Sequence, residues 1–225
     1  MTEPAAWVRA RLGIEPGDAR LFAAALTHRS ASGANNERLE FLGDAVLNLI
    51  VADILYRRFP EASEGDLSRL RARVVSTEPL AEIAVSLGLG EALRLGSGEL
   101  KTGGFRRASI LADAFEALCG ACYLDGGLQA ARDALQPLVL PRIEALPDPS
   151  ELKDAKTRLQ EYLQSRGLGL PRYSIERIEG EPHAHLFHVL CQIPKLGLTA
   201  PGSGASRRKA EQSAAQAILA GLEGA

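Results

Sequence analysis

The chain of 225 residues has room for one large domain or two modest ones, and 46% hydrophobic and 24% charged residues are typical of a globular protein. The net charge of −2 excludes a generally basic chain, although residues 1–150 hold 16 basic against 20 acidic residues and residues 151–225 hold 10 against 8. No apolar run is long enough to span a bilayer, and the N-terminus lacks a signal-peptide pattern, so we expect a cytoplasmic protein without a membrane partner.

The N-terminal two thirds of the chain carry a helical pattern. Over residues 21–143 the apolar residues recur at the spacing of an amphipathic helix, and glycine or proline interrupts them repeatedly. Two of the predicted interruptions are Gly126–Gly127 and Pro141. A short segment with two prolines follows and has the composition of a linker. We therefore predict an all-α domain over residues 1–146 and a linker over residues 147–153.

The C-terminal part has a different pattern. Two stretches alternate polar and apolar residues as strands do, and helical stretches precede and follow them. The predicted order is a helix over 154–166, strands over 172–178 and 186–193, a shorter strand over 196–200, and a helix over 207–222. We predict an α+β domain with the order α-β-β-β-α over residues 154–225.

Two of the predicted helices carry acidic residues at spacings that place them on one face. Glu37, Glu40 and Asp44 lie at positions i, i+3 and i+7, within about 60° of one another around the helix. Asp113 and Glu116 share a face of the second helix. A solvated acidic face is the usual explanation of carboxylates at such spacing, and it remains the alternative to a functional site.

Both of these helices are otherwise strongly apolar. On the first, the apolar residues gather on the side opposite the acids: Leu39, Leu42, Val46, Leu49 and Ile50. On the second, Gly120 lets another backbone approach closely. Acids in or beside a core need a compensating charge, and Mg²⁺, which prefers oxygen ligands, supplies it. A metal ion between carboxylates suits phosphodiester hydrolysis, because it activates water and neutralises charge on the leaving oxygen.

The segment Asn36-Glu-Arg-Leu-Glu-Phe-Leu-Gly-Asp-Ala-Val-Leu47 resembles the signature of the ribonuclease III family. Three further segments are similar to that family in order and spacing: Glu64 to Arg69, Gly98 to Arg107 and Ser109 to Leu118. The resemblance implies a Mg²⁺-dependent homodimer that cuts double-stranded RNA and leaves 5′-phosphate and 3′-hydroxyl ends with short 3′ overhangs. The implied substrates are precursor ribosomal RNA and structured messenger and transfer RNA precursors.

Carried over by position, the resemblance implies that the catalytic carboxylates are Glu40, Asp44, Asp113 and Glu116. Three of them would ligate the metal, namely Glu40, Asp113 and Glu116. Asp44 would organise the site and its water.

The resemblance also implies residues at a subunit boundary. Glu37 and Glu64 would line the valley where two subunits meet, in an auxiliary role, and Phe41 would fill a socket on the partner subunit. An ordinary core aromatic is the commoner fate of a phenylalanine in a helix. Lys101 and Arg106–Arg107 would reach RNA phosphates, unless they form a merely solvated basic loop.

The last 70 or so residues resemble a double-stranded-RNA-binding domain, through Lys156 to Leu163, Gly180 to His183 and Gly202 to Glu211. Such domains recognise A-form shape through 2′-hydroxyls and phosphates. The resemblance assigns Thr157, Gln160 and Glu161 to one minor groove and the loop with His183 to the next. Arg207 and Arg208 would span the phosphates between the two grooves.

The start of the last helix indicates an anion independently of the family. Arg207, Arg208 and Lys209 occupy its first turn, behind Ser206 as the predicted cap. Cations at a helix N-terminus are unfavourable by about 0.3–1 kcal/mol each, whereas a phosphate is attracted there by the free N–H groups. RNA phosphates explain this placement, and an accidental basic surface is the alternative.

Other interpretations of the chain remain open. Cys119 and Cys122 form a Cys-x-x-Cys, which fits a redox or zinc motif, but both lie on the apolar side of their helix, where cysteine behaves as a small hydrophobe. At the level of function, the rivals are an RNA-binding protein that keeps the fold without cutting, and a structural, ribosome-associated dimer.

Overall fold

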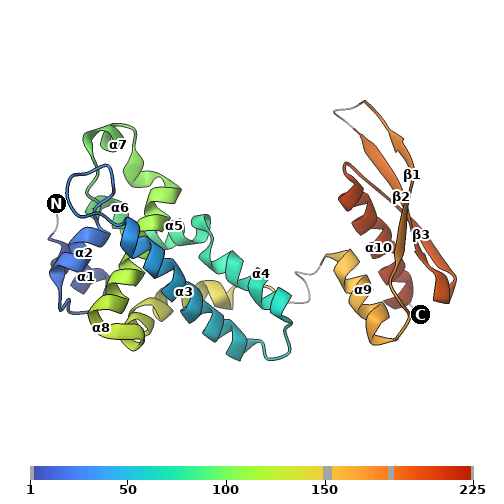
Figure 1. Ribbon diagram of the computed structural model, residues 1–225, viewed down its shortest axis with the longest axis horizontal. Helices are drawn as coiled ribbons and strands as arrows, with labels where there is room; N and C mark the ends of the chain where they lie inside the picture. Colours follow the sequence, from blue (N-terminus) through green and yellow to red (C-terminus); the bar gives the residue numbers. More distant parts are fainter. Residues whose placement is uncertain (1–2, 149–153, 182–184, 224–225) are drawn as a thin grey trace. The chain divides into compact units, whose positions relative to one another are not determined.

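The computed structural model describes residues 3–148, 154–181 and 185–223, and the chain divides into two compact units, Met1–Pro149 and Ser150–Ala225 (Figure 1). The described part of the first unit is helical, and its elements are α1 (Pro4–Leu12), α2 (Ala19–Ala25), α3 (Glu37–Arg58), α4 (Glu64–Val75), α5 (Thr77–Ser86), α6 (Leu89–Ala92), α7 (Ser97–Lys101), the 3₁₀ turn η1 (Gly104–Arg106) and α8 (Ala108–Glu144). The all-α fold predicted for this part is confirmed.

Helix α8 shows where glycine and proline do and do not interrupt a helix. Gly127 has φ 76° and ψ −176°, so α8 is broken there, as the pair Gly126–Gly127 predicted. The predicted break at Pro141 is wrong, because α8 continues to Glu144. Val139 and Ile143 are fully buried around that proline, and their packing holds the segment helical despite the lost hydrogen bond. No helix in the described segments is both long and apolar enough to cross a membrane.

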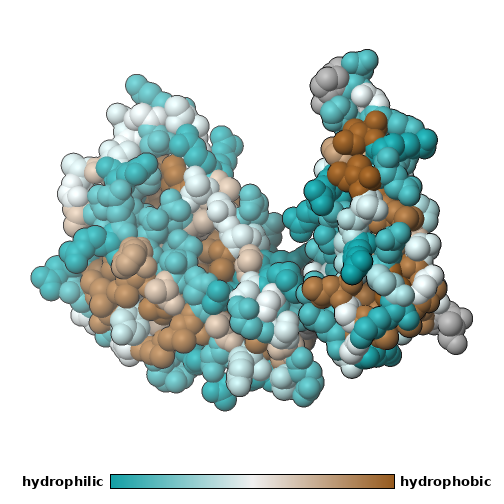
Figure 2. All heavy atoms as spheres, turned by 45° about the vertical axis from the view of Figure 1, so that its right-hand side comes forward, coloured by the Kyte–Doolittle hydropathy of each residue, from teal (hydrophilic) through white to brown (hydrophobic). Residues whose placement is uncertain are grey.

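The core of the first unit forms where α3 packs along α8. Leu47 and Ile50 of α3 and Phe115 and Leu118 of α8 are fully buried. Leu49 was expected among these residues but is 52% exposed, because apolar side chains of α3 cover more than the face that meets α8. Figure 2 shows that apolar atoms also reach the surface of both units in patches.

Two glycines set how closely α3 and α8 approach. A Cβ atom on Gly43 would overlap the carbonyl oxygen of Glu116, and one on Gly120 would overlap the carbonyl oxygen of Leu39. The close approach expected at Gly120 is therefore present, and Gly43 is its counterpart on the other helix. Gly43 of α3 thus faces the turn of α8 that carries Glu116, and Gly120 of α8 faces the turn of α3 that carries Glu40.

The cysteines of the first unit belong to its core. Cys119 and Cys122 are free and buried, and desolvation raises the pKa of Cys119 well above its usual value and that of Cys122 to about 12. Thiols held protonated in this way are poor nucleophiles and metal ligands. The small-hydrophobe interpretation of this Cys-x-x-Cys is the one that the structure supports.

The second unit has the predicted α-β-β-β-α order. Its elements are α9 (Ala155–Ser165), β1 (Arg172–Glu179), β2 (Leu186–Ile193), the 3₁₀ turn η3 (Pro194–Leu196), β3 (Leu198–Gly204) and α10 (Arg207–Glu223). The strands form an antiparallel sheet in the order β1-β2-β3, and α9 and α10 lie on one face of it (Figure 1). Between the helices and the sheet is a core that includes Leu159, Leu163, Ile193 and Ile218.

The close approach of α3 and α8 predicts a strong effect of one added methyl group. In Gly43→Ala the methyl must displace the α8 backbone at Glu116, so we expect the first unit to lose about 1–3 kcal/mol of stability, as overpacked cores do. Trp7, the one tryptophan of the chain, is buried in α1, so its fluorescence during urea unfolding reports on this unit.

The matched control is Gly98→Ala, where a Cβ meets nothing within 4 Å. A Gly43→Ala protein as stable as that control would show that α3 and α8 do not need their close approach.

Candidate functional site

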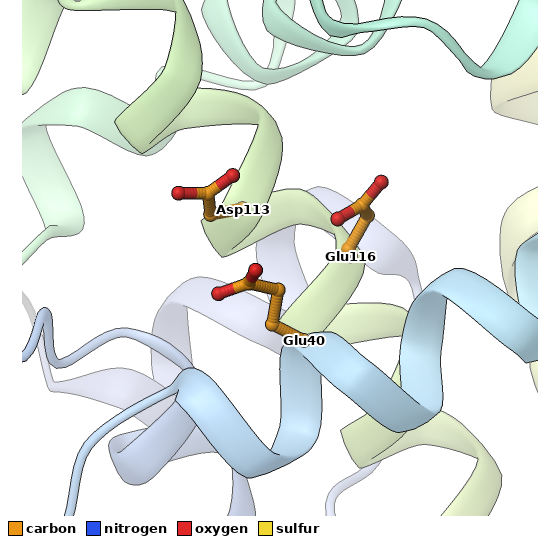
Figure 3. A group of neighbouring side chains, drawn as sticks. All are labelled: Glu40, Asp113 and Glu116. Carbon is orange, nitrogen blue, oxygen red and sulfur yellow. The ribbon is translucent and has the colours of Figure 1, made fainter.

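Three carboxylates from two helices converge in the first unit. Glu40 of α3 and Asp113 and Glu116 of α8 each offer a carboxylate oxygen, and the three oxygens lie within 4.8 Å of one another. Figure 3 shows the carboxyl group of Glu40 extending from α3 toward the turn of α8 that carries Asp113 and Glu116. All three residues are partly buried. Sequence spacing placed the acids on helix faces, and the packing of α3 on α8 brings those faces together.

Burial and mutual repulsion make ionisation of this cluster unfavourable. Desolvation, followed by the charges of Asp44, Asp113 and Glu40, raises the pKa of Glu116 to about 7. Desolvation and the charge of Asp113 likewise raise the pKa of Glu40. Desolvation also raises the pKa of Asp113, and the nearby positive charge of Arg29 offsets this effect only in part. The cluster therefore gains stability from any cation that it binds.

No lysine or arginine in the described parts of the chain forms an ion pair with Glu40, Asp113 or Glu116. Arg29 is held instead by Glu37, at 3.5 Å from Nη1 to Oε1. Three convergent oxygen donors that none of these cations pairs with directly are the donor set that a hard divalent ion prefers. The residues present thus fit a divalent metal ion.

The other acids predicted for the site lie apart from these three. Asp44 is exposed on α3 and accepts a hydrogen bond from Nδ2 of Asn48 at 2.8 Å, although it lies close enough to raise the pKa of Glu116. Glu37 pairs with Arg29 at the start of α3. Glu64 begins α4, where its carboxylate accepts the hydroxyl of Ser68 at 2.9 Å, and it is not among the residues around the cluster. Phe41 is 82% exposed, so it is no core aromatic.

A cleft of about 270 Å³ adjoins the cluster, and part of its lining was not selected from the sequence. Besides Glu40, Asp113 and Arg107, which the sequence had marked, its walls include His28 and Arg29, which it had not. Arg107 pairs with Glu99 at 3.1 Å. His28 and Arg29 belong to a polar segment between two apolar helices. That pattern predicts a loop, but it does not predict that the loop borders the acids.

The start of α10 in the second unit carries the three predicted cations. Ser206 caps the helix, since its hydroxyl accepts the N–H of Lys209 at 3.2 Å, and all three basic side chains are exposed. Two of them are already paired with acids: Arg207 with Glu211 at 2.9 Å, and Arg208 with Asp154 at 3.5 Å. These pairs offset part of the charge at the helix terminus, so the placement alone does not require an anion.

Glu211 links α9 to α10, a role that was not predicted from the sequence. Its carboxylate accepts from Lys156 Nζ at 2.6 Å and from Arg207 Nε at 2.9 Å. Burial opposes its ionisation, but the hydrogen bonds from these two cations outweigh burial and lower the pKa. The (i, i+4) spacing from Arg207 was the signal in the sequence.

The residues assigned to a minor groove lie on α9. Gln160 and Glu161 are exposed, and Thr157 is half-buried beside the helix start, where Asp154 accepts its N–H at 2.9 Å. The predicted contact His183 lies outside the described residues.

Comparison with known families matches both units. Residues 18–143 match the family described as Ribonuclease-III-like, and residues 155–222 match the double-stranded RNA binding motif. The first match covers the whole acidic cluster, and the second runs from the start of α9 to the last turn of α10.

Individual relatives match along nearly the full chain. Ribonuclease 3 of Pseudomonas fluorescens strain SBW25 is 56% identical over 222 residues, which are 99% of this chain and 97% of the relative, and Ribonuclease 3 of Hahella chejuensis is 57% identical over 93% of each chain. Among solved structures, the nuclease domain of ribonuclease III from Campylobacter jejuni is similar with a TM-score of 0.60 and 39% identity, over 65% of this chain and 100% of that domain. A second structure of that domain, with a TM-score of 0.58 and 43% identity over 60% of this chain and 95% of that one, concerns a flexible region involved in its dimer formation. Because its helical unit and its smaller unit match these two families and its relatives match along nearly the full chain, the chain belongs to the ribonuclease III family.

Proposed function

We propose that this protein is a Mg²⁺-dependent endoribonuclease that cuts double-stranded RNA as a homodimer. The observation that carries the proposal is the convergence of Glu40, Asp113 and Glu116 in a chain of the ribonuclease III family. The products would be 5′-phosphate and 3′-hydroxyl ends with short 3′ overhangs. The proposed substrates are precursor ribosomal RNA and structured messenger and transfer RNA precursors, which in bacteria lie in the cytoplasm.

The four predicted catalytic acids would have two different roles in the proposed chemistry. Glu40, Asp113 and Glu116 would hold the metal, and oxygen-only ligation favours Mg²⁺ over softer ions. When bound, the ion would activate water and neutralise charge on the leaving oxygen. Asp44, exposed at the edge of the cluster and oriented by Asn48, would accept a proton from the attacking water.

The rival interpretations explain less of this site. A purely structural protein would gain nothing from acids whose burial raises their pKa values. A non-cutting RNA-binding relative has no need of the acids either, yet all four predicted catalytic acids are present.

Removing one carboxylate tests the proposed chemistry. Glu116→Gln keeps the shape of the side chain but removes a charged ligand, so we expect cleavage of an RNA duplex in Mg²⁺ to fall by at least about 100-fold. Binding of the duplex, measured by gel shift with a chelator, should be unchanged because the second unit is intact. Glu78→Gln, at an exposed glutamate of α5, is the control, and undiminished cutting by Glu116→Gln would refute the assignment.

The raised pKa of Glu116 predicts a pH dependence of stability in the metal-free protein. Its pKa is about 7 in the folded chain and near 4.5 when unfolded, so between these values only the unfolded chain releases the proton. The contribution of Glu116 to stability is therefore lost as pH rises from about 4.5 to 7. Urea unfolding followed by Trp7 fluorescence should show this loss in wild type relative to Glu116→Gln, and Mg²⁺ should restore stability at pH 8. Parallel pH profiles of the two proteins would contradict it.

The dimer contact is proposed from an exposed aromatic and an apolar cavity on the same unit. A cavity of about 620 Å³ between α3 and α4 is lined in part by Leu49, Leu55, Tyr56 and Leu67, with Glu64 beside them. A phenylalanine such as the exposed Phe41 suits such a cavity, and a twofold axis would seat both copies at once. Glu37, one turn before Phe41, would then approach Glu64 of the partner subunit, which accounts for the separation of these two acids within one chain.

Phe41→Ala tests this contact. Losing a buried aromatic anchor should raise the dimer dissociation constant by at least about tenfold, as measured by sedimentation equilibrium. Val85→Ala removes an exposed apolar side chain of α5 and should leave the dimer intact. If Phe41→Ala dimerises as tightly as that control, another surface forms the dimer.

For the second unit we propose the contacts that its family implies. Exposed Gln160 and Glu161, with Thr157, would enter one minor groove, and His183 the next. Arg207, Arg208 and Lys209 would contact the phosphates between, with Glu211 orienting Arg207.

A further inference from the structure

The cleft beside the acidic cluster has a wall that the proposed chemistry does not use. His28 lies in this wall, on the loop between α2 and α3, and is only 9% exposed. Glu40 and Asp113 line the same cleft of about 270 Å³, so a group bound there would lie next to the reacting phosphate.

Hydrogen bonds fix which nitrogen of His28 carries the proton. The backbone N–H of Ser30 donates to Nδ1 at 3.2 Å, so Nδ1 is an acceptor. The hydroxyl of Ser30, 2.8 Å from Nδ1, itself accepts the N–H of Gly96 at 2.9 Å and is left to donate its proton to the ring. The hydrogen of the imidazole therefore resides on Nε2.

The loop that carries His28 is held rigidly. The backbone N–H of His28 donates to the carbonyl of Arg94 at 3.0 Å, and Thr27 pairs with Arg94 in a β-bridge. Gly96 lies so close to Ser30 that a Cβ there would overlap the carbonyl of Ser30. A donor on such a frame is positioned before any ligand arrives.

The charges around the cleft select the class of ligand. Four carboxylates line it, from Glu37, Glu40, Glu99 and Asp113, against two guanidinium groups. Both arginines are already paired, Arg29 with Glu37 and Arg107 with Glu99. A second phosphate would be repelled by such a lining. A neutral group that both accepts and donates suits it, because it accepts from His28 Nε2–H and donates to a carboxylate.

In a double-stranded RNA the neutral donor–acceptor group nearest a backbone phosphate is the ribose 2′-hydroxyl, which also distinguishes RNA from DNA. We propose that His28, held by Ser30, donates from Nε2 to one 2′-hydroxyl of the cleaved strand beside the scissile phosphate. His28 thereby makes the nuclease unit itself selective for RNA. This inference rests on the proposed function, and it adds a specificity-determining residue to it.

The test uses a defined hairpin RNA carrying a single 2′-deoxy or 2′-fluoro nucleotide at each position flanking the cut. The fluoro sugar keeps the RNA pucker, but its fluorine cannot donate and accepts a hydrogen bond from an N–H only very weakly, which separates hydrogen bonding from shape. Single-turnover cleavage is measured for wild type, His28→Ala, Ser30→Ala and His28→Gln. Affinity for the same hairpins is measured in chelator, and urea unfolding followed by Trp7 fluorescence reports on folding.

We expect wild type to lose about five- to tenfold in rate at one modified position, the value of one hydrogen bond, with a parallel loss of affinity. His28→Ala should cut the all-ribose hairpin five- to tenfold more slowly and no longer respond to that position. Ser30→Ala should show a smaller loss of cleavage rate at that position than wild type does. His28→Gln should recover part of the loss that His28→Ala abolishes, because the glutamine amide can donate.

Two outcomes separate the inference from the function on which it rests. If wild type fails to cut the all-ribose hairpin in Mg²⁺, the proposed function is wrong. If wild type cuts but folded His28→Ala responds to every modification as wild type does, only the role of His28 is overturned. A third hairpin carries a neutral methylphosphonate beside the cut. If wild type and His28→Ala differ in their response to the methylphosphonate but not to any 2′ change, the cleft binds a phosphate, and the proposed role of His28 is again overturned.

Discussion

The close contact of α3 and α8 at Gly43 and Gly120 is the constraint on which the rest of the first unit depends. Neither position leaves space for a Cβ, so the two backbones meet with no side chain between them. Glu40 lies one turn from Gly43, and Glu116 lies one turn from Gly120. The same contact that closes the core therefore sets the spacing of the carboxylates, and the geometry of the site follows from backbone packing rather than from a mobile loop.

That packing creates an electrostatic cost that a divalent ion removes. Carboxylates on two helices are pushed together and partly out of water, which raises the pKa of Glu116 to about 7. The same repulsion therefore lowers the stability of the metal-free unit and raises its affinity for a divalent ion. An exposed acidic face would show no such link, because water would screen the charges. This separates the cluster from the many acidic surfaces that occur without function.

In the proposed function, the two units would recognise different features of the RNA. The smaller unit presents exposed polar residues on α9 and cations at the start of α10, and Glu211 joins the two helices into one surface. Such a surface suits the repeating grooves and phosphates of a duplex but does not select a position along it. Under the proposal made here, selection of the sugar at the cut would come from the first unit, where the cleft lined by His28 and four carboxylates borders the acidic cluster.

The helical and α-β-β-β-α patterns, the importance of Gly120 and the helix faces that carry the acids could all be predicted from the sequence, because periodicity and glycine are local properties. These acids are Glu40, Asp113 and Glu116. It did not predict the burial of the surroundings of Pro141 or the exposure of Leu49, since both depend on which neighbours pack against them. Only the tertiary structure decided that Asp44 stands outside the trio of acids and that His28 borders it. The order of residues along a helix sets the direction of each side chain, whereas distances between helices arise only when their surfaces pack.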